Sequence, residues 1–226
     1  ASLFSLVFII RNAQSHSNQW PAQGQASTSH FPLLQLLAIM AARSFKDYRV
    51  HSAAEKPQTI SLIGMPGAGK STVGVLLAKL AGLGFNDTDL EIQLQAGATL
   101  QEIVDSRGHL ALRALEQDVL LQVPLEHSVI ATGGSVVYSP AIMQRLRAAG
   151  PVVYLQVPLE RLLERVAAAP PRGIACDSGQ SFADVFNERT PLYEHYASHT
   201  VLANHGDPQH TALEIVQRLA ANPAQG

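Results

Sequence analysis

The chain has 226 residues, a formal net charge of −2 and 46% hydrophobic residues. The small charge gives no basic surface for nucleic acid, and a single cysteine, Cys176, excludes an internal disulfide and a cysteine-rich metal site. No apolar run reaches the roughly 20 residues that a membrane-spanning helix needs. The length suffices for one well-buried α/β domain with chain to spare. We expect a monomer that binds neither nucleic acid nor a membrane.

Residues 1–57 differ in composition from the rest of the chain. They contain no Asp or Glu before Asp47 and many Ser, Gln and Asn residues. We therefore predict a poorly ordered N-terminal extension, followed by one domain over residues 58–226. Two origins of the extension remain open: an organelle transit peptide, which is typically acid-poor and rich in serine, or an over-called start ahead of a true start at Met40. The second origin favours a cytoplasmic protein, and the first an organelle protein.

The domain begins with a strand, a glycine-rich loop and a helix. The apolar run 60–63 predicts the strand and residues 71–81 predict the helix. Between them lies Gly64-Met65-Pro66-Gly67-Ala68-Gly69-Lys70-Ser71, a P-loop in the context that it requires. Its backbone N–H groups and the helix N-terminus can bind phosphate oxygens, whereas the alternative is a turn that binds nothing. In a P-loop, Lys70 would pair with the outer phosphates and the Ser71 hydroxyl would hold Mg²⁺.

Two carboxylates follow the next predicted strand, which covers about residues 84–86. Asp87 and Asp89 lie at the carboxyl end of that strand, where ligands bind in parallel α/β sheets. Two residues apart on extended chain, their side chains would face the same side. We interpret Asp87 as the carboxylate that positions Mg²⁺ through its water shell, and Asp89 as the base for an attacking hydroxyl. The alternative is that one of them only caps the next helix.

An arginine and a glutamate share the helical region that follows. A capping box at residues 99–102 opens a helix, Gly108 breaks it, and a second helix continues to about residue 122. Arg113 has apolar neighbours and Glu116 lies one helical turn after it. This spacing is compatible with an arginine oriented toward a carboxylate ligand and equally with a surface ion pair, so both interpretations remain open.

The rest of the chain alternates between strands and helices. A predicted strand at 128–132 ends at Gly133-Gly134-Ser135, which either admits a ligand close to the backbone or only forms a tight turn. Further strands are predicted at 152–157 and 200–203, and further helices at 140–149, 159–168, 181–198 and from 208. This alternation predicts a three-layer α/β fold, with a five-stranded parallel sheet and helices on both faces.

A loop at residues 169–180 separates two of these helices and is interpreted as a mobile lid opposite the P-loop. It carries Arg172, which would stabilise charge on the transferring phosphoryl group, and Cys176, which we interpret as inert. Arg189 lies on the following helix, within Glu188-Arg189-Thr190-Pro191-Leu192-Tyr193. The alternative for each arginine is a solvated surface charge.

From about Thr59 to the C-terminus, the order and spacing of these motifs resemble the shikimate kinase family of P-loop phosphotransferases. The resemblance implies ATP and Mg²⁺ as cofactors, and phosphorylation of a hydroxyl of shikimate to give shikimate 3-phosphate. Lys70, Asp89 and Arg172 would be catalytic. The ATP site would comprise Gly64, Gly67, Ala68, Gly69, Lys70, Ser71, Thr72, Arg165 and Arg172. Mg²⁺ would be held by Ser71 and Asp87, and the acid substrate by Asp89, Arg113, Gly133, Gly134 and Arg189.

The resemblance also implies that Glu116 orients Arg113 and that Arg165 stacks on adenine, with Pro208 opposite. One departure from the family pattern bears directly on the acceptor, because Ser135 stands where the family usually has a third glycine. The Ser135 side chain would crowd a bound ring or add a hydrogen bond to it. Two further departures are His109 after Gly108, in place of Glu, and the lid sequence Arg172-Gly173-Ile174-Ala175.

Two other functions remain as alternatives to a shikimate kinase. The first is a kinase of the same fold that acts on another hydroxy acid, such as gluconate. The second is a nucleotide-binding module that has lost catalysis. The presence of Asp89, Arg113 and Arg189 argues against the second, because a module without an acceptor has no need of these residues.

Overall fold

The computed structural model describes residues 59–169, 173, 179–204 and 206–221. The predicted N-terminal extension and the predicted lid residues Arg172 and Cys176 lie outside these ranges. The described residues all belong to one compact unit, which the contacts between residues delimit as Ser52–Gly226.

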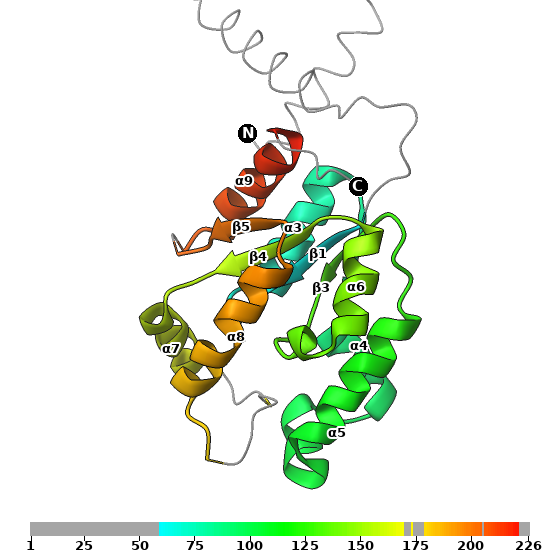
Figure 1. The fold of residues 1–226 in the computed structure, drawn as a ribbon, viewed down its shortest axis with the longest axis vertical. Coiled ribbons are helices and arrows are strands. Elements are labelled where there is room, and N and C mark those ends of the chain that lie inside the picture. The colour runs from blue at the N-terminus through cyan, green and yellow to red at the C-terminus, as the bar shows by residue number, and fades with distance from the viewer. Residues whose placement is uncertain (1–58, 170–172, 174–178, 205, 222–226) are drawn as a thin grey trace, which may run out of the picture. The chain divides into compact units, whose positions relative to one another are not determined.

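Five parallel strands form the sheet, in the order β2-β3-β1-β4-β5, of which Figure 1 labels β3, β1, β4 and β5. They are β1 Ile60–Ile63, β2 Gly84–Asp87, β3 Ser128–Ala131, β4 Val152–Gln156 and β5 His199–Leu202. Every residue of β1 and β3 is buried, as expected for a parallel sheet covered on both faces. Ala131, the last residue of β3, pairs with Leu62 of β1 on one side and with Asp87 of β2 on the other. The segments after these three strands therefore start from the same edge of the sheet.

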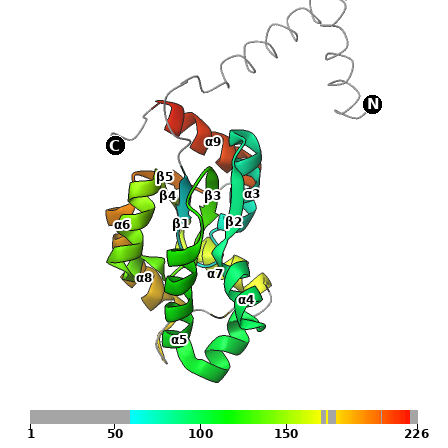
Figure 2. The same cartoon turned by 90° about the vertical axis from the view of Figure 1, so that its right-hand side faces the viewer.

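Helices cover both faces of this sheet. They are α3 Lys70–Ala81, α4 Thr88–Ala96, α5 Leu100–Gln122, α6 Pro140–Ala149, α7 Leu159–Ala168, α8 Phe182–Tyr196 and α9 Pro208–Ala221, with a 3-10 turn, η2, at Val136–Tyr138. Figure 2 shows α3 on one side of the sheet and α6 and α8 on the other, and α3 packs against α9. The prediction of a three-layer α/β fold with a five-stranded parallel sheet is confirmed.

The structure corrects the expected conformation around the two aspartates. The helix α4 already begins at Thr88, so the extended chain ends at Asp87 and does not continue to Asp89, although both carboxylates still line one cavity as expected. The reason is local, because the Asp87 side chain accepts a hydrogen bond of 3.1 Å from the Asp89 N–H and so caps α4. Capping, which was the alternative function for this pair, is therefore part of what Asp87 does.

The structure also tests two helix boundaries that the sequence predicted. Gly108 has non-helical backbone angles, φ 80° and ψ 167°, and divides α5 into two parts as predicted. The helix α8 ends at Tyr196 rather than at about residue 198, and β5 follows from His199.

A separate apolar cluster holds together α4, which carries Asp89, and α5, which carries Arg113 and Glu116. Buried side chains from α4 and α5 pack together apart from the main core, namely Ile92, Ile103, Leu112 and Val119. Each is at most 2% exposed, and burying such a side chain contributes about 1.5–3 kcal/mol. This cluster fixes the position of α5 beside α4, and α4 begins directly at the sheet edge.

Candidate active site

The loop between β1 and α3 has the backbone geometry of a phosphate site. Gly64, Gly67 and Gly69 have φ values of 144°, 82° and 92°. At Gly64 a Cβ atom would lie 2.8 Å from the carbonyl oxygen of Leu155, so only glycine fits there. No side chain caps the start of α3 and no acidic residue occupies its first turn. The first N–H groups of α3 are therefore left to an anionic ligand.

Lys70 folds back over this loop. Its Nζ donates hydrogen bonds of 2.8 Å to the Gly64 carbonyl and 3.0 Å to the Met65 carbonyl. The side chain is buried, and burial lowers the pKa of Lys70 to about 8 although the charges of Asp89 and Asp87 oppose the shift. Two carbonyl dipoles thus hold a buried ammonium group directly over the P-loop.

Ser71 and Asp87 line one cavity of about 260 Å³ together with Asp89 and the first turn of α5. A hydroxyl and a carboxylate are oxygen donors of the kind that Mg²⁺ prefers. Within the described ranges, no group of three or more His, Cys, Asp or Glu side chains could hold a metal by itself. Mg²⁺ at this position would therefore complete its shell with phosphate oxygens and water, which is how Mg²⁺ is usually bound in kinases.

On the other side of the loop, Arg165 contacts the P-loop from α7. Its guanidinium donates to the carbonyls of Gly67, at 3.3 Å, and Ala203, at 3.1 Å. A cavity of about 210 Å³ lies beside it, and both Thr72 and Pro208 contribute to its wall. Arg165 and Pro208 thus line one cavity next to the loop.

The turn after β3 brings two carboxylates together. The Gly133 N–H donates to the Thr88 hydroxyl at 3.1 Å, which ties the turn to the start of α4. A Cβ atom on Gly133 would overlap the Glu116 Oε1 atom and would lie 3.2 Å from the Asp89 Oδ1 atom. Glu116 and Asp89 therefore both reach the space above this glycine, which leaves no room for a side chain there.

Gly133→Ala is expected to lower the free energy of unfolding by about 1–3 kcal/mol, because the added methyl group displaces a packed carboxylate. Gly84→Ala is the matched control, since a Cβ atom at Gly84 would make an ordinary contact of 3.4 Å with the His127 carbonyl oxygen. Urea unfolding of both variants measures the difference. Equal unfolding free energies for the two variants would contradict the close approach of Glu116.

Ser135 directs its hydroxyl at Glu116. The hydroxyl donates a hydrogen bond to Glu116 Oε2, and both residues are buried. Burial, and next the charge of Asp89, raise the pKa of Glu116 to about 8. The interpretation of Arg113 and Glu116 as a surface ion pair is wrong, because Glu116 is only 6% exposed. The sequence did not indicate this serine–glutamate contact.

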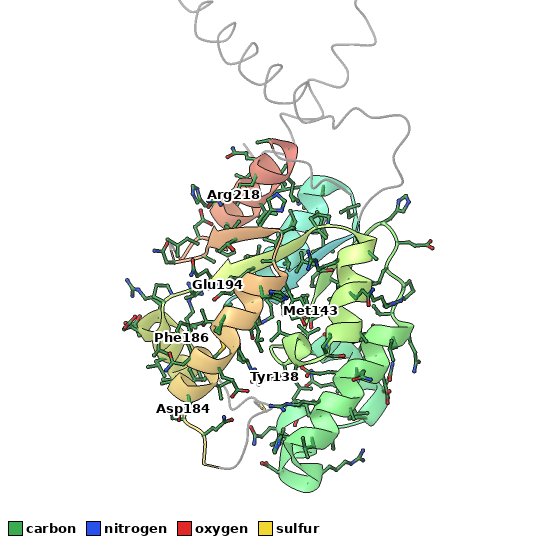
Figure 3. The ribbon with its side chains drawn as sticks, in the orientation of Figure 1. Tyr138, Met143, Asp184, Phe186, Glu194 and Arg218 are labelled. Atoms are coloured by element: carbon green, nitrogen blue, oxygen red, sulfur yellow. The ribbon has the colours of Figure 1, made fainter. Side chains whose placement is uncertain are left out.

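The two arginines meet at one tyrosine. The Arg113 guanidinium lies 4.2 Å from the centre of the Tyr138 ring, and that of Arg189 lies 5.2 Å from it. Arg189 Nε also donates to the Tyr138 hydroxyl at 3.2 Å. Figure 3 shows Tyr138 between α8 and α5, the helices that carry the arginines. Sequence reasoning missed Tyr138, because a lone aromatic residue in a short 3-10 turn has no periodic signal.

Arg189 is held against the glycine turn. Its side chain is only 1% exposed, so the alternative of a solvated surface charge is wrong for this arginine. A Cβ atom on Gly134 would lie 3.0 Å from Arg189 Nη1. Tyr193, one turn later on α8, donates to the Gly134 carbonyl at 2.5 Å and stacks on Tyr154 at 5.1 Å between ring centres. Tyr193 is the last residue of the segment 188–193 that the sequence singled out. Its spacing of four residues from Arg189 puts both side chains on one face of a helix, and this spacing was the signal that could have placed Tyr193 beside the glycine turn.

Fold and site together define a P-loop phosphotransferase: a phosphate loop follows the central strand, a buried lysine covers it, and a carboxylate and two arginines gather at the same sheet edge. Within the part of the chain that the structure describes, no helix is both long and apolar enough to cross a membrane. Where Arg172 lies relative to this site falls outside the described residues.

Comparison with known proteins gives the family. The family model for shikimate kinase matches residues 66–220. A shikimate kinase of Pseudomonas syringae pv. tomato is 36% identical over 169 residues, which are 74% of this chain and 98% of the relative. A shikimate kinase of Mycobacterium avium is 36% identical over 166 residues, which are 72% of this chain and 94% of the relative. The chain belongs to the shikimate kinase family.

Solved structures agree with this assignment. The structure of shikimate kinase from Acinetobacter baumannii in complex with shikimate has a TM-score of 0.66 to this fold and 33% sequence identity, covering 74% of this chain and 96% of that one. Shikimate kinase from Aquifex aeolicus has a TM-score of 0.62 and 30% identity, covering 74% and 99%. The P-loop fold and its order of elements are therefore those of the family.

Proposed function

We propose that this protein transfers the γ-phosphoryl group of ATP to a hydroxyl of shikimate, giving shikimate 3-phosphate, with Mg²⁺ as the metal cofactor. The observation that carries the proposal is that the lysine-covered phosphate loop, Asp89 and the Arg113–Arg189 pair all gather at one edge of the sheet. Family membership supports the choice of acceptor, since a relative from Acinetobacter baumannii has been solved with shikimate bound.

On the nucleotide side, the uncapped start of α3 and the loop N–H groups bind the β- and γ-phosphates. Lys70 exchanges its two carbonyl partners for phosphate oxygens and stabilises the charge that develops during transfer. Arg165 and the cavity beside it receive the adenine. Ser71 and Asp87 would hold Mg²⁺, which when bound neutralises charge shared by the β- and γ-phosphates.

On the acceptor side, Arg113 and Arg189 bind the carboxylate of the acid as charge-assisted donors. Gly133 and Gly134 would contribute backbone groups to the bound acid, because their missing side chains let Glu116 and Arg189 pack close to the turn. Asp89 accepts the proton of the reacting hydroxyl. Holding the acid at both ends orients this hydroxyl toward the γ-phosphate, so that binding energy offsets the entropy of alignment.

Arg113→Ala is expected to raise the KM for shikimate about 10- to 100-fold and to leave kcat and the KM for ATP nearly unchanged, because a charged hydrogen bond to the substrate contributes about 1.5–3 kcal/mol. Arg107→Ala is the matched control, an exposed arginine on the same helix. Steady-state kinetics with a coupled assay of ADP release measure both variants. An unchanged KM for shikimate would remove Arg113 from the carboxylate clamp.

The acceptor itself is tested with a panel of hydroxy acids in the same ADP-release assay, with shikimate and gluconate as the two main acceptors. Shikimate is expected to give the highest kcat/KM, and ³¹P NMR of the product is expected to show a phosphate monoester. A higher kcat/KM for gluconate would favour the other kinase of this fold. Tight ATP binding without transfer to any acceptor would favour a nucleotide-binding module.

A further inference from the structure

We propose that a second small-molecule site lies behind the arginine clamp, that it binds a small amphipathic carboxylate, and that its occupant weakens acceptor binding by competing for Arg113. The site is a cavity of about 270 Å³ between α5, η2 and the first turn of α6. Arg113 and Tyr138 line it, whereas no residue of the P-loop does, and neither do Asp89 and Arg189. It therefore lies next to the acceptor space, and Arg113, Glu116 and Ser135 form the wall between the two.

The lining of this cavity selects the chemistry of its occupant. Buried apolar side chains form part of its wall, with Leu120 and Ile142 each only 1% exposed. Gln117 and Ser139 add polar groups, and Arg113 supplies a guanidinium that can bind a carboxylate at two points. An apolar pocket with a few convergent polar groups is the usual form of a small-molecule site.

The size of the cavity and the charges around it further limit which molecules can bind there. The cavity volume of about 270 Å³ leaves room for a compact ring or branched chain attached to one carboxylate. Glu116 also lines the cavity, but its Oε2 atom accepts the Ser135 hydroxyl, and burial raises its pKa to about 8. Because burial disfavours the charged form of Glu116, the repulsion between this group and a bound anion next to Arg113 is reduced.

Arg113 couples the cavity to the acceptor. Its guanidinium stacks on Tyr138, whose hydroxyl accepts a hydrogen bond from Arg189. A carboxylate in the cavity draws Arg113 toward α6 and takes a donor from the clamp. The coupling is reciprocal, so a bound acceptor equally weakens the occupant of the cavity. The kinetic part of this inference rests on the proposed function, whereas binding to the cavity does not.

The test uses 3-phenylpropionate as the probe, a phenyl ring on a short chain that ends in a carboxylate. Ala114→Trp places a bulky side chain at the mouth of the cavity, because Ala114 lines it and is exposed. Leu110→Trp is the matched control, with the same new residue on the same helix at a position 66% exposed and outside the lining. In the absence of the probe, both variants are expected to keep the KM for shikimate within twofold of the wild type.

Two readouts decide the outcome. The first readout is ligand-observed NMR titration without substrates. 3-Phenylpropionate is expected to bind the wild type and Leu110→Trp equally well, and Ala114→Trp at least fivefold more weakly. The neutral 3-phenylpropionamide should bind the wild type and Leu110→Trp more weakly than the acid does. In kinetics, the probe should raise the apparent KM for shikimate except in Ala114→Trp. Binding or inhibition that persists undiminished in Ala114→Trp places the probe in the acceptor site and overturns the proposal. Binding lost in Ala114→Trp supports the cavity even if shikimate is not the acceptor.

Discussion

Lys70→Met is expected to lower kcat by about a thousandfold, because a preorganised charge aimed at the transition state is among the largest contributions to catalysis. Methionine keeps much of the volume of the buried side chain and removes the ammonium group that now bonds to the Gly64 and Met65 carbonyls. The loop N–H groups remain in place, so some binding of nucleotide should persist. Single-turnover transfer of the γ-phosphoryl group, followed by rapid quenching, measures the effect on chemistry directly.

The control for this variant is Lys79→Met, an exposed lysine in the last turn of the same helix. It makes the same chemical change on α3 without touching the phosphate loop, so its rate should match the wild type. Turnover of Lys70→Met at a rate close to that of Lys79→Met would rule out the P-loop mechanism proposed here.

Asp89→Asn is expected to lower kcat by about 10²- to 10⁴-fold while nucleotide binding stays close to that of the wild type, because an amide of the same shape cannot accept the proton of the hydroxyl. The Asp89 backbone N–H, which donates to Asp87, is unaffected, so the cap of α4 should remain. Pre-steady-state transfer and equilibrium binding of ADP, measured side by side, separate the two effects.

Asp118→Asn is the matched control for the charge change, since Asp118 is exposed on α5. Wild-type rates are expected for this variant. If Asp89→Asn retained the rate of Asp118→Asn, another group would have to be the base. If Asp89→Asn instead lost nucleotide binding together with turnover, Asp89 would belong to the nucleotide side of the site.

The sequence predicted the fold well, because the strands of a buried parallel sheet appear as apolar runs and the phosphate loop has a fixed spacing. The runs that became β1, β3 and β4 are buried almost throughout. Local capping was harder to predict. Asp87 is extended as expected, but the chain turns into α4 at Thr88, where the Asp87 side chain accepts a hydrogen bond from the Asp89 N–H.

Contacts between distant segments were beyond the sequence patterns. The Ser135 hydroxyl bonds to Glu116, 19 residues away, and Arg189 bonds to Tyr138, 51 residues away. Neither pair shares a helix face or a strand, so no periodicity could predict it. The fold brings these segments together because β3 ends beside β1, and α5 and α8 both reach the turn that follows β3.

Several expectations stay predictions. The role of residues 1–57, the action of Arg172 in the lid and the inert character of Cys176 concern segments outside the described residues. The monomeric state and the cytoplasmic location, with the organelle as its alternative, likewise stay predictions. Gly173, one of the described residues of the predicted lid, lies against the Leu100 carbonyl at the start of α5, where its missing Cβ atom would overlap that oxygen.

The most direct test is a crystal structure of the protein with ADP, Mg²⁺ and shikimate. The proposed arrangement predicts the β-phosphate of ADP in the loop at the start of α3, the shikimate carboxylate between Arg113 and Arg189, and a ring hydroxyl in hydrogen-bond contact with Asp89. Shikimate bound with its carboxylate away from both arginines, or with no hydroxyl near Asp89, would contradict it.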